Sequence, residues 1–326
     1  MARIVLGLGS SHSPQLSTPP DLWPLHGERD KRNPGLFDTD GTHLSYDELL
    51  AKASPALAKE VTPEIWQGRY EACQTGIARL AQTLAQVSPD IAIIMGDDQE
   101  ELFSDDNMPA VLVYWGEEML NRPHYGESPS PGLRAAAWAY GEKDRSYPVA
   151  ADLGKHLIEY LIGDGFDVAH SRKLRPGQSM GHAFSFVYGR LMNGKPIPTV
   201  PIMVNTYYPP NQPTPKRCYD LGRAVRAAVE AWPSDARVAV IGSGGLSHFV
   251  IDEDLDHQVI RALQAKDVGA VRALPRQRMN SGTSEIRNWI AAAGAVEHLD
   301  MQLIDYVPCY RSPAGTGCAM GFAQWV

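Results

Sequence analysis

Three histidines in this sequence of 326 residues lie in turns rich in glycine and other small residues. His12 and His248 each follow an apolar run typical of a buried strand, and His182 ends the turn 176–182. An imidazole changes charge near neutral pH, so it can transfer protons or bind a metal ion. His12 and His248 each follow the carboxyl end of a predicted strand. If the two strands are neighbours, both side chains can converge on one site, because ligands bind at the carboxyl ends of the strands in open α/β sheets. A polar loop histidine without a chemical role fits the turn around His248 equally well.

Two groups of potential oxygen ligands accompany these histidines. The acidic and amide-rich turn 97–101 follows the apolar run 90–95, and Glu285 follows a Ser-Gly-Thr turn. Carboxylate and amide oxygens suit hard or borderline cations. Both groups could instead lie at the N-terminus of a helix, where acidic side chains interact favourably with the helix dipole. Glu285 also fits a capping box. Two nitrogen or oxygen ligands and one carboxylate, with open positions, describe the site of non-haem Fe(II) oxygenases, but these residue types also suit Zn(II) and Mn(II).

The elements that must position these residues alternate between apolar runs and amphipathic helices. This alternation predicts one α/β domain over residues 1–326, with a mostly parallel central sheet flanked by helices. The main strands are expected at 3–8, 90–95, 166–170, 198–205, 237–241 and 302–307, and the main helices at 149–163, 218–231, 253–263 and 286–293.

Residues 17–88 are expected to form a helical excursion over this sheet. The stretch 17–68 is rich in proline, aspartate and glycine, and helical spacing is seen at 46–59. A long irregular connection in a compact domain is often a lid or a binding loop. His26 and His43, which lie in this stretch, are expected at the surface.

Composition narrows the choice of partners and compartment. The formal net charge is −8, and no basic stripe or long apolar run occurs, so neither nucleic acid nor a membrane is expected as a partner. The four cysteines are scattered and the first residues lack a signal-peptide pattern. We therefore expect a reduced, cytoplasmic protein.

Three motifs together resemble the class III extradiol ring-cleavage dioxygenases, which include the catalytic subunit of protocatechuate 4,5-dioxygenase and the gallate and 3-O-methylgallate dioxygenases. The motifs are Gly9-Ser-Ser-His12-Ser-Pro, Tyr207-Tyr-Pro-Pro followed by Lys216-Arg-Cys, and Gly244-Gly-Leu-Ser-His248. The resemblance extends from residue 1 to the last strand and is densest over 199–249.

The resemblance implies an Fe(II) centre with His12 and Glu285 as ligands. The family's second histidine ligand lies in an Asn-Asp-His turn, and Gln99 occupies its place here. A glutamine carbonyl binds Fe(II) more weakly than imidazole does. Either Gln99 is a ligand, or Asp97 or Asp98 replaces it, or the metal site is degraded.

The same resemblance implies the remaining roles. His248 corresponds to the family's catalytic acid/base, and His182 to a histidine that orients the substrate or stabilises oxygen intermediates. The backbone N–H groups of Ala314 and Gly315 and the hydroxyl of Thr316 correspond to a segment that faces the substrate carboxylate.

The implied reaction is the opening of a catecholic acid beside its diol with O2, in the catabolism of aromatic or lignin-derived compounds. The substrate would be of the 3-O-methylgallate, gallate or protocatechuate type. A homodimer without a separate small subunit is expected, with residues 17–68 covering the site. The alternatives are another metal-dependent enzyme on the same scaffold, or a metal-free binding protein, which the glutamine at position 99 keeps open.

Overall fold

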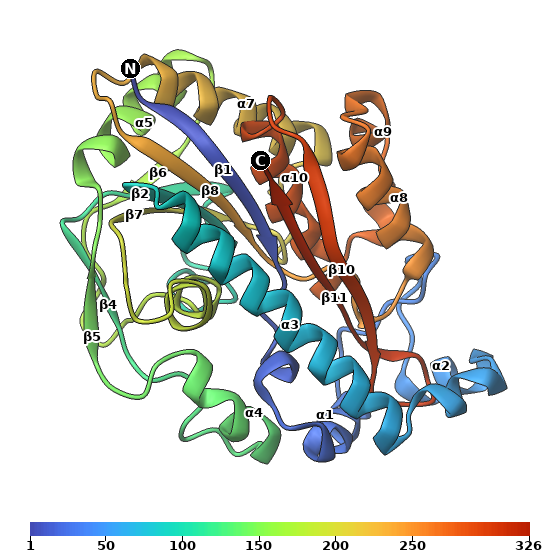
Figure 1. The fold of residues 1–326 in the computed structure, drawn as a ribbon. Helices are drawn as coiled ribbons and strands as arrows, with labels where there is room; N and C mark the ends of the chain where they lie inside the picture. Colours follow the sequence, from blue (N-terminus) through green and yellow to red (C-terminus); the bar gives the residue numbers. More distant parts are fainter.

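Four parallel strands form the middle of a nine-stranded mixed sheet (Figure 1). They are β1 (Arg3–Ser10), β8 (Arg237–Ser243), β2 (Ile91–Asp97) and β7 (Thr199–Val204), side by side in that order. The computed structural model describes residues 1–326. The predicted α/β fold with a mostly parallel sheet is confirmed.

Antiparallel pairing extends the sheet at both edges. β11 (Thr316–Trp325) pairs with β1, β10 (Met301–Tyr310) and the short β9 (His248–Val250). At the other edge β3 (Val111–Tyr114) runs antiparallel to β7 and parallel to β6 (Ala169–Ser171). A separate ribbon joins β4 (Glu118–Asn121) to β5 (Arg145–Pro148).

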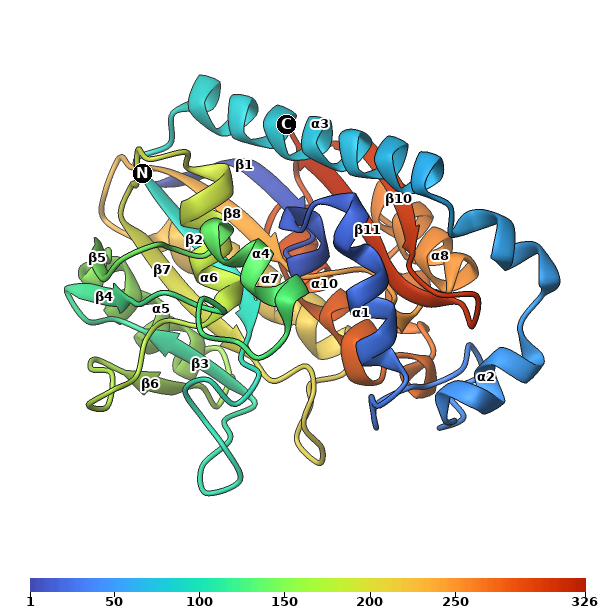
Figure 2. The ribbon, with the colours of Figure 1, turned by 90° about the horizontal axis from the view of Figure 1, so that it is seen from below.

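Helices cover both faces of the sheet. The long helix α3 (Pro63–Val87) crosses one face, and Figure 2 shows it set apart from the helices on the other face. Those helices are α5 (Ala151–Gly163), α7 (Pro215–Ala231), α8 (Glu253–Gln264), α9 (Val268–Arg272) and α10 (Ile286–Ala295). Four further α-helices are α1 (Trp23–Asp30), α2 (Tyr46–Lys52), α4 (Pro131–Ala136) and α6 (His182–Phe186).

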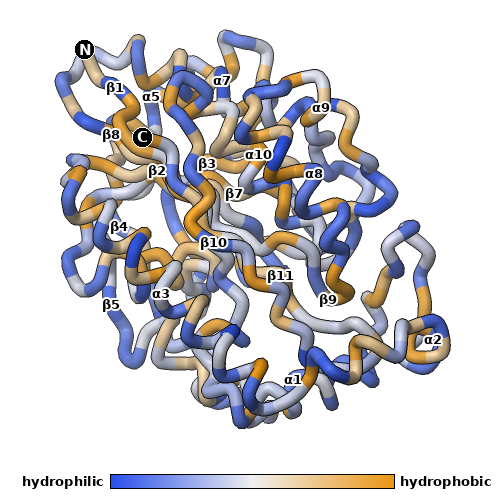
Figure 3. The backbone as a smooth tube through the Cα atoms, turned by 45° about the vertical axis from the view of Figure 1, so that its right-hand side comes forward, coloured by the Kyte–Doolittle hydropathy of each residue, from blue (hydrophilic) through white to orange (hydrophobic).

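The core follows from the alternation of side chains along the strands. In β2, Ile91, Ile93 and Met95 join the buried cluster that includes α5, α7 and α10, whereas Ala92 and Ile94 join the cluster that includes α3. Successive side chains of a strand point to opposite faces, so a continuously apolar strand is required when both faces are covered. Figure 3 shows hydrophobic segments along central strands such as β1 and β8, and further ones in helices such as α10.

Some predicted boundaries were wrong. The helix expected over 46–59 ends at Lys52, and a 3₁₀ segment, Pro55–Glu60, follows. Ser54 is extended because the ring of a following proline disfavours helical backbone. The strand expected over 166–170 is instead β6, which begins at Ala169.

The excursion before α3 is tied to the body of the molecule. Trp23 and Leu36 are fully buried, and α1 and α4 lie at the end of the molecule toward which β1 points (Figures 1 and 2). No helix has the length and apolar character needed to cross a bilayer.

Candidate active site

The ends of β1, β8 and β2 bring together residues that are far apart in the sequence. His12 lies two residues beyond β1, Ser243 is the last residue of β8, and Asp97 is the last residue of β2. Glu285 immediately precedes α10, and His248 begins β9. All five side chains are buried. The structure therefore brings His12, His248 and Glu285 into one cluster. The convergence of the two histidines was expected from the strands that precede them, and that of Glu285 from the family resemblance.

The hydrogen bonds of His12 identify its tautomer. The Ser243 hydroxyl donates to the carbonyl of Ala183 at 2.7 Å, so its oxygen accepts from Nδ1–H of His12 at 3.0 Å. The other ring nitrogen, Nε2, then carries a lone pair. It is buried and makes no hydrogen bond, although it lies 3.3 Å from Oε2 of Glu285 and 3.9 Å from Oδ1 of Asp97. A buried lone pair beside two carboxylates fits a divalent cation.

Ser243→Ala tests this orienting role. Without the Ser243 hydroxyl, the His12 ring can rotate and can carry its proton on either nitrogen. We therefore expect the affinity for a divalent metal ion to fall about 10- to 100-fold, as is typical for groups that orient metal ligands. The measurement is competition with a chromophoric chelator. Ser17→Ala, which removes a buried hydroxyl that accepts from Arg190, serves as the control. Equal affinities in wild type and Ser243→Ala would contradict the assignment.

Glu285 is the most heavily hydrogen-bonded acid of the cluster. Its Oε2 accepts from the backbone N–H of Gly245 at 2.7 Å, and its Oε1 lies 3.2 Å from Nε2 of His248 and 3.3 Å from the Tyr207 hydroxyl. Burial alone favours the neutral acid, but the adjacent His248 and His12 outweigh it and hold the pKa of Glu285 well below its usual value. A Cβ on Gly245 would lie 2.6 Å from Cε1 of His248, so only glycine permits this approach.

Gln99 connects the two buried carboxylates. Its Nε2 donates to Oδ2 of Asp97 at 3.1 Å and to Oε1 of Glu285 at 3.0 Å, so the amide nitrogen rather than the carbonyl faces the cluster. Asp97 also accepts from Asn288 at 3.0 Å. Burial, followed by the charge of Glu285, raises the pKa of Asp97, and a cation between the two carboxylates would relieve this repulsion.

Asp98, the other alternative to Gln99, has a different function in the structure. Its two carboxylate oxygens accept from the backbone N–H groups of Leu102 and Phe103, both at 3.0 Å. Asp98 therefore shapes the turn after β2, and Asp97 is the aspartate placed with His12.

His182 lies against His12, with the two rings edge to face and their centroids 4.6 Å apart. One ligand atom from each of His12, Asp97 and His182 lies within 4.8 Å of the others. Nδ1 of His182 is 3.0 Å from Oε1 of Glu101. Burial lowers the pKa of His182, but Glu101 outweighs this effect and raises it to about 10. This pairing was not predicted from the sequence, although Glu101 belongs to the acidic turn 97–101.

His248 presents one ring nitrogen to the cluster because the other is anchored. Nδ1–H donates to the carbonyl of Leu246 at 2.8 Å, which leaves Nε2 facing Glu285. Burial lowers the pKa of His248, but Glu285 outweighs it and raises it to about 9.

The site residues His12, Gln99, His182, His248 and Glu285 line a cavity of about 180 Å³, and Asp97 lies behind this lining. A comparable apolar cavity of about 150 Å³ holds a benzene ring, so the space suits a ligand with one substituted ring. The lining also includes residues from α1 and from the end of β10. The full lining comprises His12, Ser13, Pro14, Gln15, His26, Arg29, Gln99, Tyr125, Leu133, His182, Tyr207, His248, Phe249, Glu285, Arg311 and Cys318.

The prediction that His26 lies at the surface was wrong. His26 is 3% exposed and bonds to the Thr18 hydroxyl at 3.0 Å. Burial, followed by the charges of Arg311 and Arg29, lowers its pKa to about 3. His43 is exposed, as predicted.

The segment expected to face a substrate carboxylate lies outside the cavity lining. Ala314, Gly315 and Thr316 form the turn between β10 and β11. The N–H of Ala314 donates to the Ser312 hydroxyl, that of Gly315 to the Ser312 carbonyl, and the Thr316 hydroxyl bonds to the Ser312 hydroxyl. These donors are therefore engaged within the turn itself.

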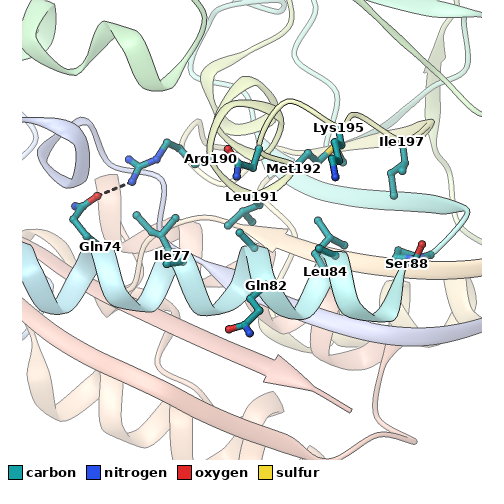
Figure 4. Close-up of a pocket in the computed structure, with 15 residues that line it drawn as sticks. Gln74, Ile77, Gln82, Leu84, Ser88, Arg190, Leu191, Met192, Lys195 and Ile197 are labelled. Atoms are coloured by element: carbon teal, nitrogen blue, oxygen red, sulfur yellow. Dashed lines mark hydrogen bonds between the residues drawn. The ribbon is translucent and has the colours of Figure 1, made fainter.

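A larger hollow of about 670 Å³ lies elsewhere, between α3 and residues 190–197 (Figure 4). Most of its lining is aliphatic or amide, and its Arg190 donates to Gln74 at 2.6 Å. It contains no group of histidines and carboxylates, so the smaller cavity at the strand ends is the candidate active site.

Comparison with known proteins identifies the family of the chain. A family model described as the catalytic LigB subunit of aromatic ring-opening dioxygenase matches residues 52–316. The gallate dioxygenase of Pseudomonas putida is 35% identical over 106 residues, 32% of this chain and 30% of that protein. A 2,3-dihydroxyphenylpropionate/2,3-dihydroxicinnamic acid 1,2-dioxygenase of Photorhabdus laumondii is 32% identical over 174 residues, 52% of this chain and 46% of that protein.

The chain matches less than half the length of these curated relatives. The family model, by contrast, covers most of the chain and confirms the family expected from the three motifs. The chain belongs to the LigB family of catalytic subunits of aromatic ring-opening dioxygenases.

Proposed function

We propose that this protein is an Fe(II)-dependent extradiol dioxygenase that opens the ring of a catecholic acid with O2. The observation that carries the proposal is the buried, unpartnered Nε2 of His12 beside Glu285 and Asp97, in a cavity sized for one ring. The two relatives named above are called gallate dioxygenase and 2,3-dihydroxyphenylpropionate/2,3-dihydroxicinnamic acid 1,2-dioxygenase. These names support a substrate with both hydroxyl and carboxylate groups.

His12, Glu285 and Asp97 would hold the ion. Imidazole and carboxylate are both ligand types of non-haem Fe(II) sites, which usually combine two imidazoles with one carboxylate. Gln99 would keep the two carboxylates in place through its amide N–H groups. Fe(II) held there would supply redox chemistry toward O2 and a positive charge that favours ionised substrate hydroxyls.

His248 would move the substrate's proton. Its Nδ1 is anchored to the Leu246 carbonyl, so Nε2 is the nitrogen that exchanges a proton with a hydroxyl in the cavity. The charge of Glu285 keeps Nε2 protonated, and a cation that neutralised Glu285 would free this nitrogen to accept the substrate's proton. His182, held by Glu101, would orient the ring or donate a hydrogen bond to reduced oxygen. These groups are buried, and exclusion of water strengthens each electrostatic contact.

Oxygen consumption tests the proposal. Protein loaded anaerobically with Fe(II) is mixed with protocatechuate, gallate, 3-O-methylgallate, 2,3-dihydroxyphenylpropionate or catechol, and product spectra are recorded. We expect one O2 to be consumed per ring opened with at least one of the acids. A protein that cannot retain Fe(II) would instead support the metal-free binding protein, and a protein that binds metal without oxygen uptake would support another metal-dependent activity.

A further inference from the structure

Arg29 places an unneutralised positive charge in the catalytic cavity. It lines the same cavity as His12, His248 and Glu285. Its Nη1 is buried without a hydrogen-bond partner. Because a buried donor left unpaired is costly, especially on a charged group, an acceptor supplied by a ligand would stabilise this nitrogen.

The neighbouring acids do not neutralise Arg29. Asp30, which follows it on α1, forms a two-point ion pair with Arg311, with both N–O distances at 2.7 Å. Glu28, which precedes it, pairs with Lys31. The Asp30–Arg311 ion pair is therefore neutral overall, and the positive charge of Arg29 beside the cavity has no paired acid. Burial and then Arg311 lower the pKa of Arg29, but a guanidinium stays charged at neutral pH.

Helix α1 holds Arg29 in a defined place. Trp23 on the same helix is fully buried and donates to the Thr18 carbonyl at 3.1 Å. The Asp30–Arg311 pair ties the end of α1 to the end of β10. Arg29 is thus presented from a fixed helix, which reduces the entropy lost when it binds an anion.

We propose that Arg29 binds the carboxylate of the aromatic substrate and makes the enzyme specific for catecholic acids. This inference rests on the proposed function. A guanidinium is suited to two-point recognition of a carboxylate. The donors of Ala314, Gly315 and Thr316, expected from the resemblance to face this carboxylate, are engaged with Ser312, whereas Nη1 of Arg29 is unpartnered. The residue belongs to the stretch 17–68, so part of the substrate site comes from the excursion of the same chain.

Anaerobic calorimetry with two probes tests this role without turnover. Fe(II)-loaded protein is titrated with protocatechuate and with catechol, which differ only in the carboxylate. We expect Arg29→Met to weaken protocatechuate binding about 10- to 100-fold, the loss typical of a charge-assisted hydrogen bond, and to leave catechol binding unchanged. Arg29→Lys should recover part of the loss, and Arg32→Met, which removes an exposed arginine after α1, should behave as wild type.

Two results would overturn the assignment while leaving the dioxygenase in place. One is unchanged protocatechuate binding in Arg29→Met, and the other is an equal loss for both probes, which would indicate a structural role. Wild-type protein that bound neither probe and consumed no oxygen would overturn the proposed function as well.

Discussion

Replacing His248 by alanine is expected to lower kcat/KM for ring opening about 10²- to 10⁴-fold, the usual contribution of a general acid or base, while one metal ion stays bound per chain. The variant removes the only ring nitrogen that the Leu246 contact leaves directed toward Glu285. It retains His12, Asp97 and Glu285. Anaerobic iron analysis followed by oxygen uptake measures both quantities on the same sample.

His257→Ala is the matched control, because His257 is exposed on α8. It should retain wild-type activity and iron. If His248→Ala lost its iron together with its activity, His248 would be a ligand rather than the proton acceptor. Full activity in His248→Ala would refute the acid/base role.

The second large effect, a loss of metal affinity, is expected when the carboxylate of Glu285 or Asp97 is replaced by an amide. Glu285→Gln and Asp97→Asn each keep the shape of the side chain but remove a negative charge from a fully buried position. We expect each to reduce Fe(II) affinity by more than the roughly 100-fold attributed to groups that only orient ligands. The measurements are metal content after gel filtration and the visible spectrum of the Co(II)-loaded protein, which reports the ligand set independently of activity.

Gln99→Ala separates the two possible functions of the amide. In the structure Gln99 donates to both carboxylates, so its removal should weaken metal binding less than Asp97→Asn does, with little change in the Co(II) spectrum. A stronger effect of Gln99→Ala than of Asp97→Asn would instead make Gln99 the ligand. Glu118→Gln, a change at an exposed acid of β4, controls for net charge.

The sequence predicted the convergence of the site because convergence depends on strand order and strand ends. His12 and His248 follow β-branched runs, and two such runs, β1 and β8, are neighbours in the sheet. The periodicity that identifies strands and helices is local, so it can be recognised in one chain. The same reasoning located the turn 97–101 at the cluster.

Orientation and pairing of side chains could not be predicted in the same way. Whether Gln99 presents its oxygen or its nitrogen depends on the two carboxylates that face it from β2 and from the turn before α10. The burial of His26 and the unpaired charge of Arg29 depend on how α1 packs against residues after β10. No period in the sequence encodes these contacts between distant segments, so the irregular stretch 17–68 was the least predictable part.

The central position of β1 has a consequence for biosynthesis. Its two neighbours in the sheet are β8 and β11, and His12 is separated from its partner Ser243 by 231 residues. At a translation rate of about 5–20 residues per second, this apolar strand waits roughly 10–50 s on the ribosome before its first neighbour is made. An unpaired apolar edge is prone to aggregation during that interval. We therefore expect the nascent chain to depend on chaperone protection, and the metal ion to be loaded only after residue 285 has emerged.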